Sequence, residues 1–313
     1  VYVMASMVHK STDGGRTWSR GFEYGGDNHV LWIDPDNSEH MLLGYDYGFA
    51  TSFDSGKNWL HVDNVSMAQI YAIGVDMEFP YNVYGGLQDF GSWKGPSTKK
   101  GRFPIRFEDW EHVQGGDGFY NQVDPTNGRW LYTESQFGSL SRNDQKTGVR
   151  RRIRYRGNRN LRFNWNAPLL ISPHDPDVIY HGANILLKSP FRGERWEEVS
   201  PDLTNNDASK FGGREVGQYG TTTTIDESPV EQGVLWVGTD DGNVQVSRDG
   251  GESWQLLNEN IPGNPGYWVS RVIASHHDAG TAYVTFTGRL AADYAPFVYK
   301  TTDYGDTWTS IAS

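Results

Sequence analysis

The sequence predicts an all-β protein, a seven-bladed β-propeller whose first blade is incomplete. An octapeptide recurs four times, a strand–turn–strand unit recurs six times, and amphipathic helical periodicity is scarce. The turns of the six units begin at residues 34, 76, 124, 172, 226 and 275, so successive units lie 42 to 54 residues apart. A repeat of this length that holds four short strands is typical of a propeller blade.

The octapeptide has the pattern Ser/Thr-x-Asp-x-Gly-x-polar-Trp. At a hairpin tip the Asp can accept hydrogen bonds from its own turn, the Gly permits a left-handed backbone, and the Trp can wedge between sheets. We therefore expect these aspartates to be structural rather than catalytic. The positions are Asp13 and Trp18, Asp54 and Trp59, Asp249 and Trp254, and Asp303 and Trp308. Degenerate copies at residues 93–97, 141–148 and 188–196 would complete a set of seven hairpins.

The first unit starts directly at its second strand, residues 1–5, and lacks the innermost strand that the other six units have. An open sheet edge next to apolar faces invites aggregation. We therefore expect residues 1–313 to form a single propeller domain that is a fragment or module of a longer chain, with the missing strand supplied from elsewhere.

Composition excludes several classes of function. The chain has no Cys, which rules out disulfides, thiol catalysis and thiolate-bound metals. The formal net charge of −11 opposes binding to nucleic acid or to anionic lipid, and no apolar run is long enough to insert into a membrane. No metal, nucleophile or phosphate motif occurs, so no cofactor is expected, and His276-His277-Asp278 is interpreted as a strand-joining turn.

Two segments interrupt the blade pattern. Residues 91–102 are predicted to be a loop rich in Gly, Ser and Lys. The basic run of residues 150–156 is interpreted as a strand whose arginines face solvent, with a site for an anion or a sulfated polysaccharide as the alternative.

Loops that enter the innermost strands, or that follow the second strands, meet on one face of a propeller and form the mouth of its channel. Carboxylates, amides and aromatic rings in these loops are the groups that bind sugars, although turn chemistry alone explains such residues equally well. The candidate ligand-binding residues are Asp46, Tyr47, Gln88, Trp165, Tyr219, Asp240, Trp268 and Arg289.

Glycoside hydrolysis would need two carboxyl groups about 5 to 10 Å apart, one of them protonated. The carboxylates of the expected mouth are Asp46, Asp89, Asp117, Glu134 and Asp240.

The octapeptides resemble the Asp-box, or BNR repeat, of β-propeller proteins. Longer strings at residues 83–97, 115–120, 162–166 and 200–204 resemble a bacterial family of large exported proteins described as sortilin-like, BNR-repeat or "glycosyl hydrolase-like". This resemblance implies an extracytoplasmic binding or scaffold module for protein or glycan partners, beside further domains of the same chain or in a larger assembly. Sortilin receptors and photosystem assembly factors carry the box and act by binding.

The related xyloglucanases imply the alternative, an endo-β-glucanase. Their catalytic aspartates lie in Gly-Asp loops at the mouth, and the nearest positions here are Asp89 and Asp117, although both loops depart from the family pattern. Fold analogy does not decide between catalysis and recognition.

Overall fold

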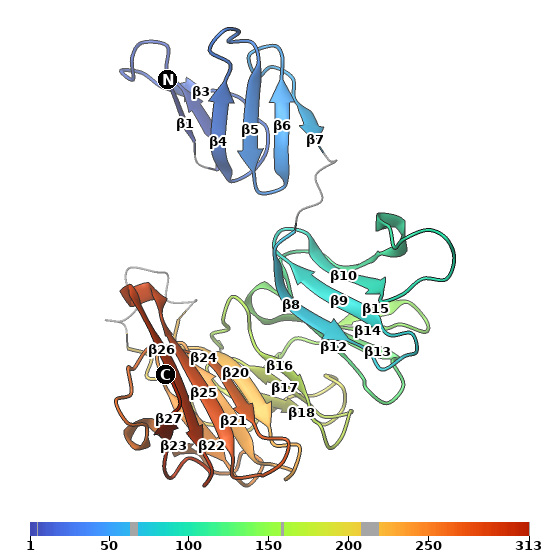
Figure 1. Ribbon diagram of the computed structural model, residues 1–313, viewed down its shortest axis with the longest axis vertical. Helices are drawn as coiled ribbons and strands as arrows, with labels where there is room; N and C mark the ends of the chain where they lie inside the picture. Colours follow the sequence, from blue (N-terminus) through green and yellow to red (C-terminus); the bar gives the residue numbers. More distant parts are fainter. Residues whose placement is uncertain (5, 63–67, 158–159, 208–218, 313) are drawn as a thin grey trace. The chain divides into compact units, whose positions relative to one another are not determined.

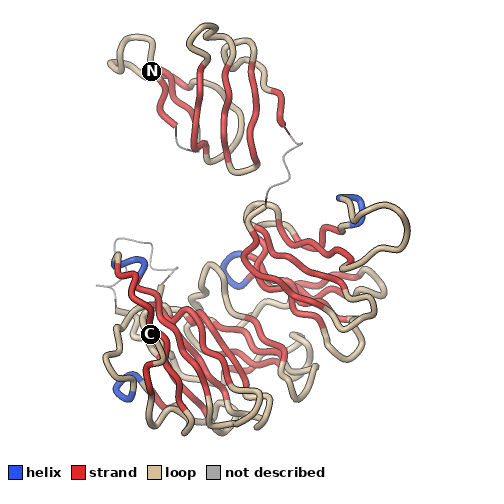
Figure 2. The backbone as a smooth tube through the Cα atoms, viewed as in Figure 1, coloured by secondary structure: helices blue, strands red, loops and turns tan. Residues whose placement is uncertain are grey.

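The computed structural model describes residues 1–4, 6–62, 68–157, 160–207 and 219–312. These residues form seven antiparallel sheets, with helix limited to short 3₁₀ segments, so the predicted all-β propeller fold is confirmed (Figure 2). The chain divides into two compact units, residues 1–69 and 70–313.

Unit 1 (residues 1–69) contains two sheets. The first has only three strands, β1 (Tyr2–Met4), β2 (Val8–Lys10) and β3 (Ser19–Arg20), which confirms the incomplete first blade. The second has four strands, β4 (Asn28–Ile33), β5 (Met41–Tyr45), β6 (Gly48–Ser52) and β7 (Leu60–Val62). Apolar side chains of both sheets, with Val8, Met41 and Leu43 at the centre, form its core.

Unit 2 (residues 70–313) contains five four-stranded sheets, each a meander in chain order (Figure 1). Each sheet is named here by its first strand, and the first strands of successive sheets adjoin. The strands are β8 (Ile70–Val75), β9 (Asn82–Leu87), β10 (Gly91–Pro96), β11 (Glu111–Gln114); β12 (Gly118–Val123), β13 (Trp130–Ser135), β14 (Ser139–Asp144), β15 (Val149–Arg152); β16 (Leu169–Ile171), β17 (Ile179–Gly182), β18 (Leu186–Ser189), β19 (Glu197–Glu198); β20 (Thr222–Glu227), β21 (Leu235–Thr239), β22 (Val244–Ser247), β23 (Gln255–Leu256); and β24 (Trp268–Ala274), β25 (Ala282–Gly288), β26 (Asp293–Thr301), β27 (Thr309–Ser310). The 3₁₀ segments include η1 (Phe107–Asp109), η2 (Gln136–Gly138), η5 (Asn258–Asn260) and η6 (Arg289–Ala291).

The sheets of unit 2 pack face to face through large apolar side chains. Between the β20 and β24 sheets, Trp236 is fully buried and meets Trp308 edge to face at 6.1 Å between ring centroids. Between the β8 and β12 sheets the backbones themselves approach closely, because a Cβ atom on Gly86 would lie 2.1 Å from the carbonyl oxygen of Phe119. Glycine at this position is therefore a steric requirement.

The octapeptides form the turns that join the third and fourth strands of their sheets, or the last two strands of the first sheet. At residues 247–254, Oγ of Ser247 accepts a hydrogen bond from the amide of Gly251 at 2.8 Å, and Oδ1 of Asp249 accepts one from the amide of Ser253 at 2.9 Å. The hydroxyl of Ser253 also donates to Asp249 and lowers the pKa of that carboxyl to about 2. The turns at residues 11–18, 52–59 and 301–308 repeat these contacts.

Two sequence interpretations need correction. Residues 93–97 do not form a hairpin turn, because residues 91–96 are strand β10 and pair with β9 along their whole length. The predicted loop at 91–102 is therefore wrong in its first half. The basic run is a strand only as far as Arg152, where β15 ends, and the next residue, Ile153, is buried.

Candidate functional site

Two of the candidate carboxylates, Asp89 and Asp117, lie next to each other in unit 2. Asp89 is in the turn between β9 and β10, after Gln88, and Asp117 directly precedes β12. The main-chain amide of Asp89 donates a hydrogen bond to Oδ1 of Asp117 at 3.1 Å. Asp89 has a left-handed backbone with φ of +61°, which few residues other than glycine adopt. The Asp117 carboxylate therefore helps to hold a strained turn.

Several aromatic rings lie near this pair of carboxylates. The ring of Tyr71, on β8, lies 4.6 Å from that of Phe119 on β12, measured between centroids. Phe119 and Phe137 in turn meet the indole of Trp165 edge to face, at 6.1 and 5.0 Å. We call Tyr71, Asp89, Asp117, Phe119 and Trp165 the acidic–aromatic cluster.

The charges of the cluster act on one another. Burial raises the pKa of the Tyr71 phenol, and the negative charges of Asp117 and Asp89 raise it further. Tyr71 therefore stays protonated at neutral pH and can donate a hydrogen bond. Trp165 is 39% exposed while Asp117 is only 5% exposed, so the cluster presents an aromatic ring to solvent beside acceptors that lie deeper.

A polar chain continues from Trp165 to the neighbouring sheets. The amide nitrogen of Asn164 donates to Oγ1 of Thr221 at 2.9 Å, and Thr221 donates from its hydroxyl and its main-chain amide to the carboxyl of Asp240, at 2.6 and 2.9 Å. Segments just before β16 and β20 are thereby tied to the end of β21.

Asp240 is the most perturbed of the candidate ligand-binding carboxyls. It is 3% exposed, and burial raises its pKa to about 7, with a contribution from the negative charge of Asp241. The Asp240 carboxyl therefore keeps its proton to a much higher pH than an exposed aspartate does. A carboxyl with such a pKa suits a general acid, but hydrogen bonds from Thr221 engage both of its oxygens.

Glu134, also considered as a mouth carboxylate, is fully buried where β13 ends. Burial raises its pKa well above the ordinary value of 4.5. Its side chain therefore lies in the interior, away from solvent and from any ligand at the surface.

The other candidates lie in separate places. Trp268 begins β24 and pairs with Thr287, whose hydroxyl accepts a hydrogen bond from the amide of Arg289, so these residues share one end of the β24 sheet. Tyr219 is buried before β20, with 9% of its surface exposed. In unit 1, Asp46 contacts Nε2 of His29 at 2.6 Å, and Tyr47 is 51% exposed.

Sequence reasoning missed two members of this network, Phe137 and Thr221. Phe137 lies in η2 with a left-handed backbone, and its partner Trp165 is distant in sequence. Thr221 directly precedes the first strand of its sheet, as Asp117 does, and this equivalent position is the signal that could have identified it.

Within the described ranges, no group of three or more His, Asp or Glu side chains is arranged to hold a metal ion. No helix among these residues has the length and apolarity to span a membrane.

No family model matches the sequence, and no curated protein matches it. Among solved structures, the extracellular domain of a putative hybrid two-component system from B. thetaiotaomicron is similar over 94% of this chain and 36% of its own, with 11% identity and a TM-score of 0.50. The GH74 xyloglucanase from Xanthomonas campestris is similar over 98% of this chain and 56% of its own, with 14% identity and a TM-score of 0.39. YCF48 bound to D1 peptide is similar over 90% of this chain and 85% of its own, with 12% identity and a TM-score of 0.43.

The chain thus spans less than two thirds of the first two structures. Likeness at these identities concerns the fold alone. The seven antiparallel sheets, each a meander in chain order, define the chain as a β-propeller protein.

Proposed function

We propose that the chain is a recognition module that binds a glycan at the acidic–aromatic cluster, as one propeller domain of a longer, extracytoplasmic chain. The resemblance of its octapeptides to the Asp-box, and of its longer strings to exported sortilin-like proteins, supports export and a longer parent chain.

The observation that carries the proposal is the partly exposed indole of Trp165, in one cluster with Asp89 and Asp117. A pyranose ring offers a flat apolar face that stacks on an indole, and its hydroxyls donate to carboxylates. The carboxylate of Asp117 is held in place by the amide of Asp89, so the acceptors are fixed before a ligand arrives.

The test is titration of neutral β-glucan oligosaccharides into the protein, followed by calorimetry. Trp165→Ala should weaken binding by about tenfold or more, because the stacking surface is removed. Trp18→Ala is the matched control, since the Trp18 indole is 44% exposed and lies outside the cluster. Equal affinity of the Trp165→Ala variant and the parent, or binding of a protein partner alone, would refute the glycan proposal.

The second candidate function is glycoside hydrolysis with Asp89 and Asp117 as the acid and base. The adjacency of these two residues favours it, since the charges of both act on the same phenol of Tyr71. Release of reducing ends from xyloglucan by the parent, lost in Asp89→Asn and in Asp117→Asn but kept in Asp36→Asn, at an exposed turn, would support this alternative over a binding role. A parent protein that releases no sugar would eliminate it.

A further inference from the structure

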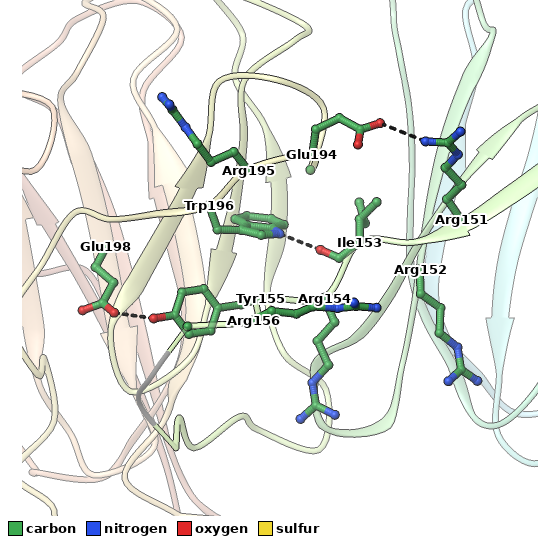
Figure 3. Close-up of a pocket in the computed structure, with 12 residues that line it drawn as sticks. Arg151, Arg152, Ile153, Arg154, Tyr155, Arg156, Glu194, Arg195, Trp196 and Glu198 are labelled. Carbon is green, nitrogen blue, oxygen red and sulfur yellow. Dashed lines mark hydrogen bonds and ion pairs between the residues drawn. The ribbon is translucent and has the colours of Figure 1, made fainter.

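A pocket of about 840 Å³ lies in unit 2 beside the basic run. It is lined by residues 151–157, which follow and include the end of β15, and by residues 193–196 and 198, around the start of β19 (Figure 3). Its volume is within the range of pockets that bind small ligands.

The lining of this pocket is strongly basic. Five arginines face two glutamates, which gives a local excess of three positive charges in a chain whose net charge is −11. The arginines are Arg151, Arg152, Arg154, Arg156 and Arg195.

Both glutamates already have partners. Glu194 accepts from Arg142 at 2.6 Å and lies 3.7 Å from Arg151, and Glu198 accepts a hydrogen bond from the hydroxyl of Tyr155. In the described part of the chain, no carboxylate lies within 4 Å of the guanidinium groups of Arg152, Arg154 or Arg156. These three cations are therefore available to an anionic ligand.

The two segments that line the pocket are held together at Ile153. The indole of Trp196 donates a hydrogen bond to the carbonyl of Ile153 at 2.5 Å, and Figure 3 shows the arginine side chains on different sides of this indole. Gly193 has φ of +84°, and a Cβ atom there would lie 2.4 Å from Cδ1 of Ile153. The turn that carries Trp196 is thus packed tightly against the basic run.

The charge of Arg154 acts on a buried histidine beneath the pocket. His181, fully buried, lies against Trp196 at 6.0 Å between ring centroids. Burial lowers the pKa of His181 to about 3, and the charge of Arg154 lowers it further. The histidine is therefore neutral, and the pocket owes its charge to the arginines.

We propose that this pocket binds an acidic oligosaccharide that carries sulfate or carboxylate groups. Guanidinium groups form paired, charge-assisted hydrogen bonds with sulfate and carboxylate oxygens. The rings of Trp196 and Tyr155, both half-buried in the lining, offer flat faces on which a sugar ring can stack. The negative charge of the whole chain disfavours a long polyanion such as nucleic acid and favours a short ligand that fits within the basic patch.

This site is separate from the acidic–aromatic cluster and takes an acidic rather than a neutral saccharide, so either proposal can fail without the other. The probes are a dextran sulfate oligosaccharide and an oligogalacturonate, with neutral dextran and polyglutamate as comparisons. Binding is measured by calorimetry on the full chain.

We expect the dextran sulfate oligosaccharide, the oligogalacturonate or both to bind, neutral dextran not to bind, and affinity to fall as salt is raised from about 0.05 to about 0.5 M. The double variant Arg154→Gln, Arg156→Gln should lose about tenfold or more in affinity. The control, Arg16→Gln with Arg102→Gln, removes the same charge from exposed arginines outside the pocket and should bind like the parent.

Which of the two acidic saccharides binds more tightly distinguishes sulfate from carboxylate recognition. The proposal is overturned if neither binds, or if the pocket variant and the control lose affinity equally. It is also overturned if polyglutamate binds as tightly as the saccharides and depends on the same arginines, because the site would then recognise acidic peptides.

Discussion

At the scale of single residues, burial decides how the carboxyl groups of this protein behave. Asp240 and Asp249 have the same side chain, but the pKa of Asp240 is about 7 and that of Asp249 is about 2. Asp240 is enclosed by protein, whereas Asp249 stands at a turn and receives hydrogen bonds from Ser253. Identical residue types therefore acquire opposite pH dependence from their surroundings.

The raised pKa of Asp240 predicts a specific effect of Asp240→Asn. The folded state holds this proton more tightly than the unfolded state, so Asp240 makes the folded state lose stability as the pH rises from about 4 through 7. The asparagine variant lacks this loss. Its unfolding free energy, relative to that of the parent, should therefore rise by up to about 4 kcal/mol over that interval. Urea unfolding of both proteins at a series of pH values measures the difference.

Asp306→Asn serves as the control, because Asp306 is exposed. Its unfolding free energy should follow that of the parent at every pH. A constant difference between Asp240→Asn and the parent, independent of pH, would contradict the assigned protonation.

At the scale of elements, the contact between the β8 and β12 sheets depends on glycine. Gly86→Ala would place a methyl group 2.1 Å from the carbonyl oxygen of Phe119, which belongs to the backbone and cannot swing away. We expect this variant to lose about 1 to 3 kcal/mol of unfolding free energy, or more, because the sheets must separate.

Gly85→Ala, one position earlier on β9, is the matched control. Its new methyl group would meet only Cδ1 of Leu87, the end of a flexible side chain, at 3.3 Å. Chemical denaturation of the two variants should therefore rank Gly86→Ala as clearly less stable. Equal stabilities would show that the sheets do not require the close approach.

The elements show where reasoning from sequence succeeds. Strand and turn positions repeat along the chain, so one unit predicts the next, and the three-stranded first sheet followed directly from counting units. Residues 93–97 were misjudged because their Trp, Gly, Pro and Ser suit a turn locally, whereas pairing with β9 makes them a strand. Similarly, the arginines at 154 and 156 follow a strand pattern, but Ile153 turns inward and β15 ends.

At the scale of the whole molecule, periodicity predicts the class of fold, and position in the repeat predicts which loops carry polar residues. It does not predict contacts. Two examples are the hydrogen bond from the amide of Asp89 to the Asp117 carboxylate and the one from the amide of Thr221 to Asp240. Both depend on how neighbouring sheets pack. The basic pocket was anticipated only as the less favoured alternative, because it joins two segments about 40 residues apart.

The two kinds of carboxyl predict the pH profile of stability. Hydrogen bonds from the residue four positions later lower the pKa values of Asp13, Asp54, Asp249 and Asp303, so the stability that they contribute is lost as the pH falls below about 4. Burial raises the pKa of Asp226 to about 6 and that of Asp240 to about 7, so the stability that they contribute is lost as the pH rises from about 4 to these values. Burial also raises the pKa of Glu134, which acts in the same direction.

We therefore expect the unfolding free energy to reach its maximum at about pH 4 to 5 and to fall on both sides. Urea titrations between about pH 3 and pH 8 test this expectation. A steady rise in stability up to pH 8 would mean that the buried carboxyls are ionised at little cost.

The turn at residues 189–196 shows what the repeat tolerates. Oγ of Ser189 accepts a hydrogen bond from the amide of Gly193 at 2.8 Å, as the first residue of each intact octapeptide does from its glycine. Phe191 replaces the aspartate of the octapeptide, and Arg195 replaces its small polar residue. This turn therefore keeps the serine, the glycine and the tryptophan of the octapeptide, and it forms without the aspartate and the small polar residue. Arg195, at one of these positions, lines the basic pocket. Hairpin tips of this kind are natural places to graft new recognition sequences onto the scaffold.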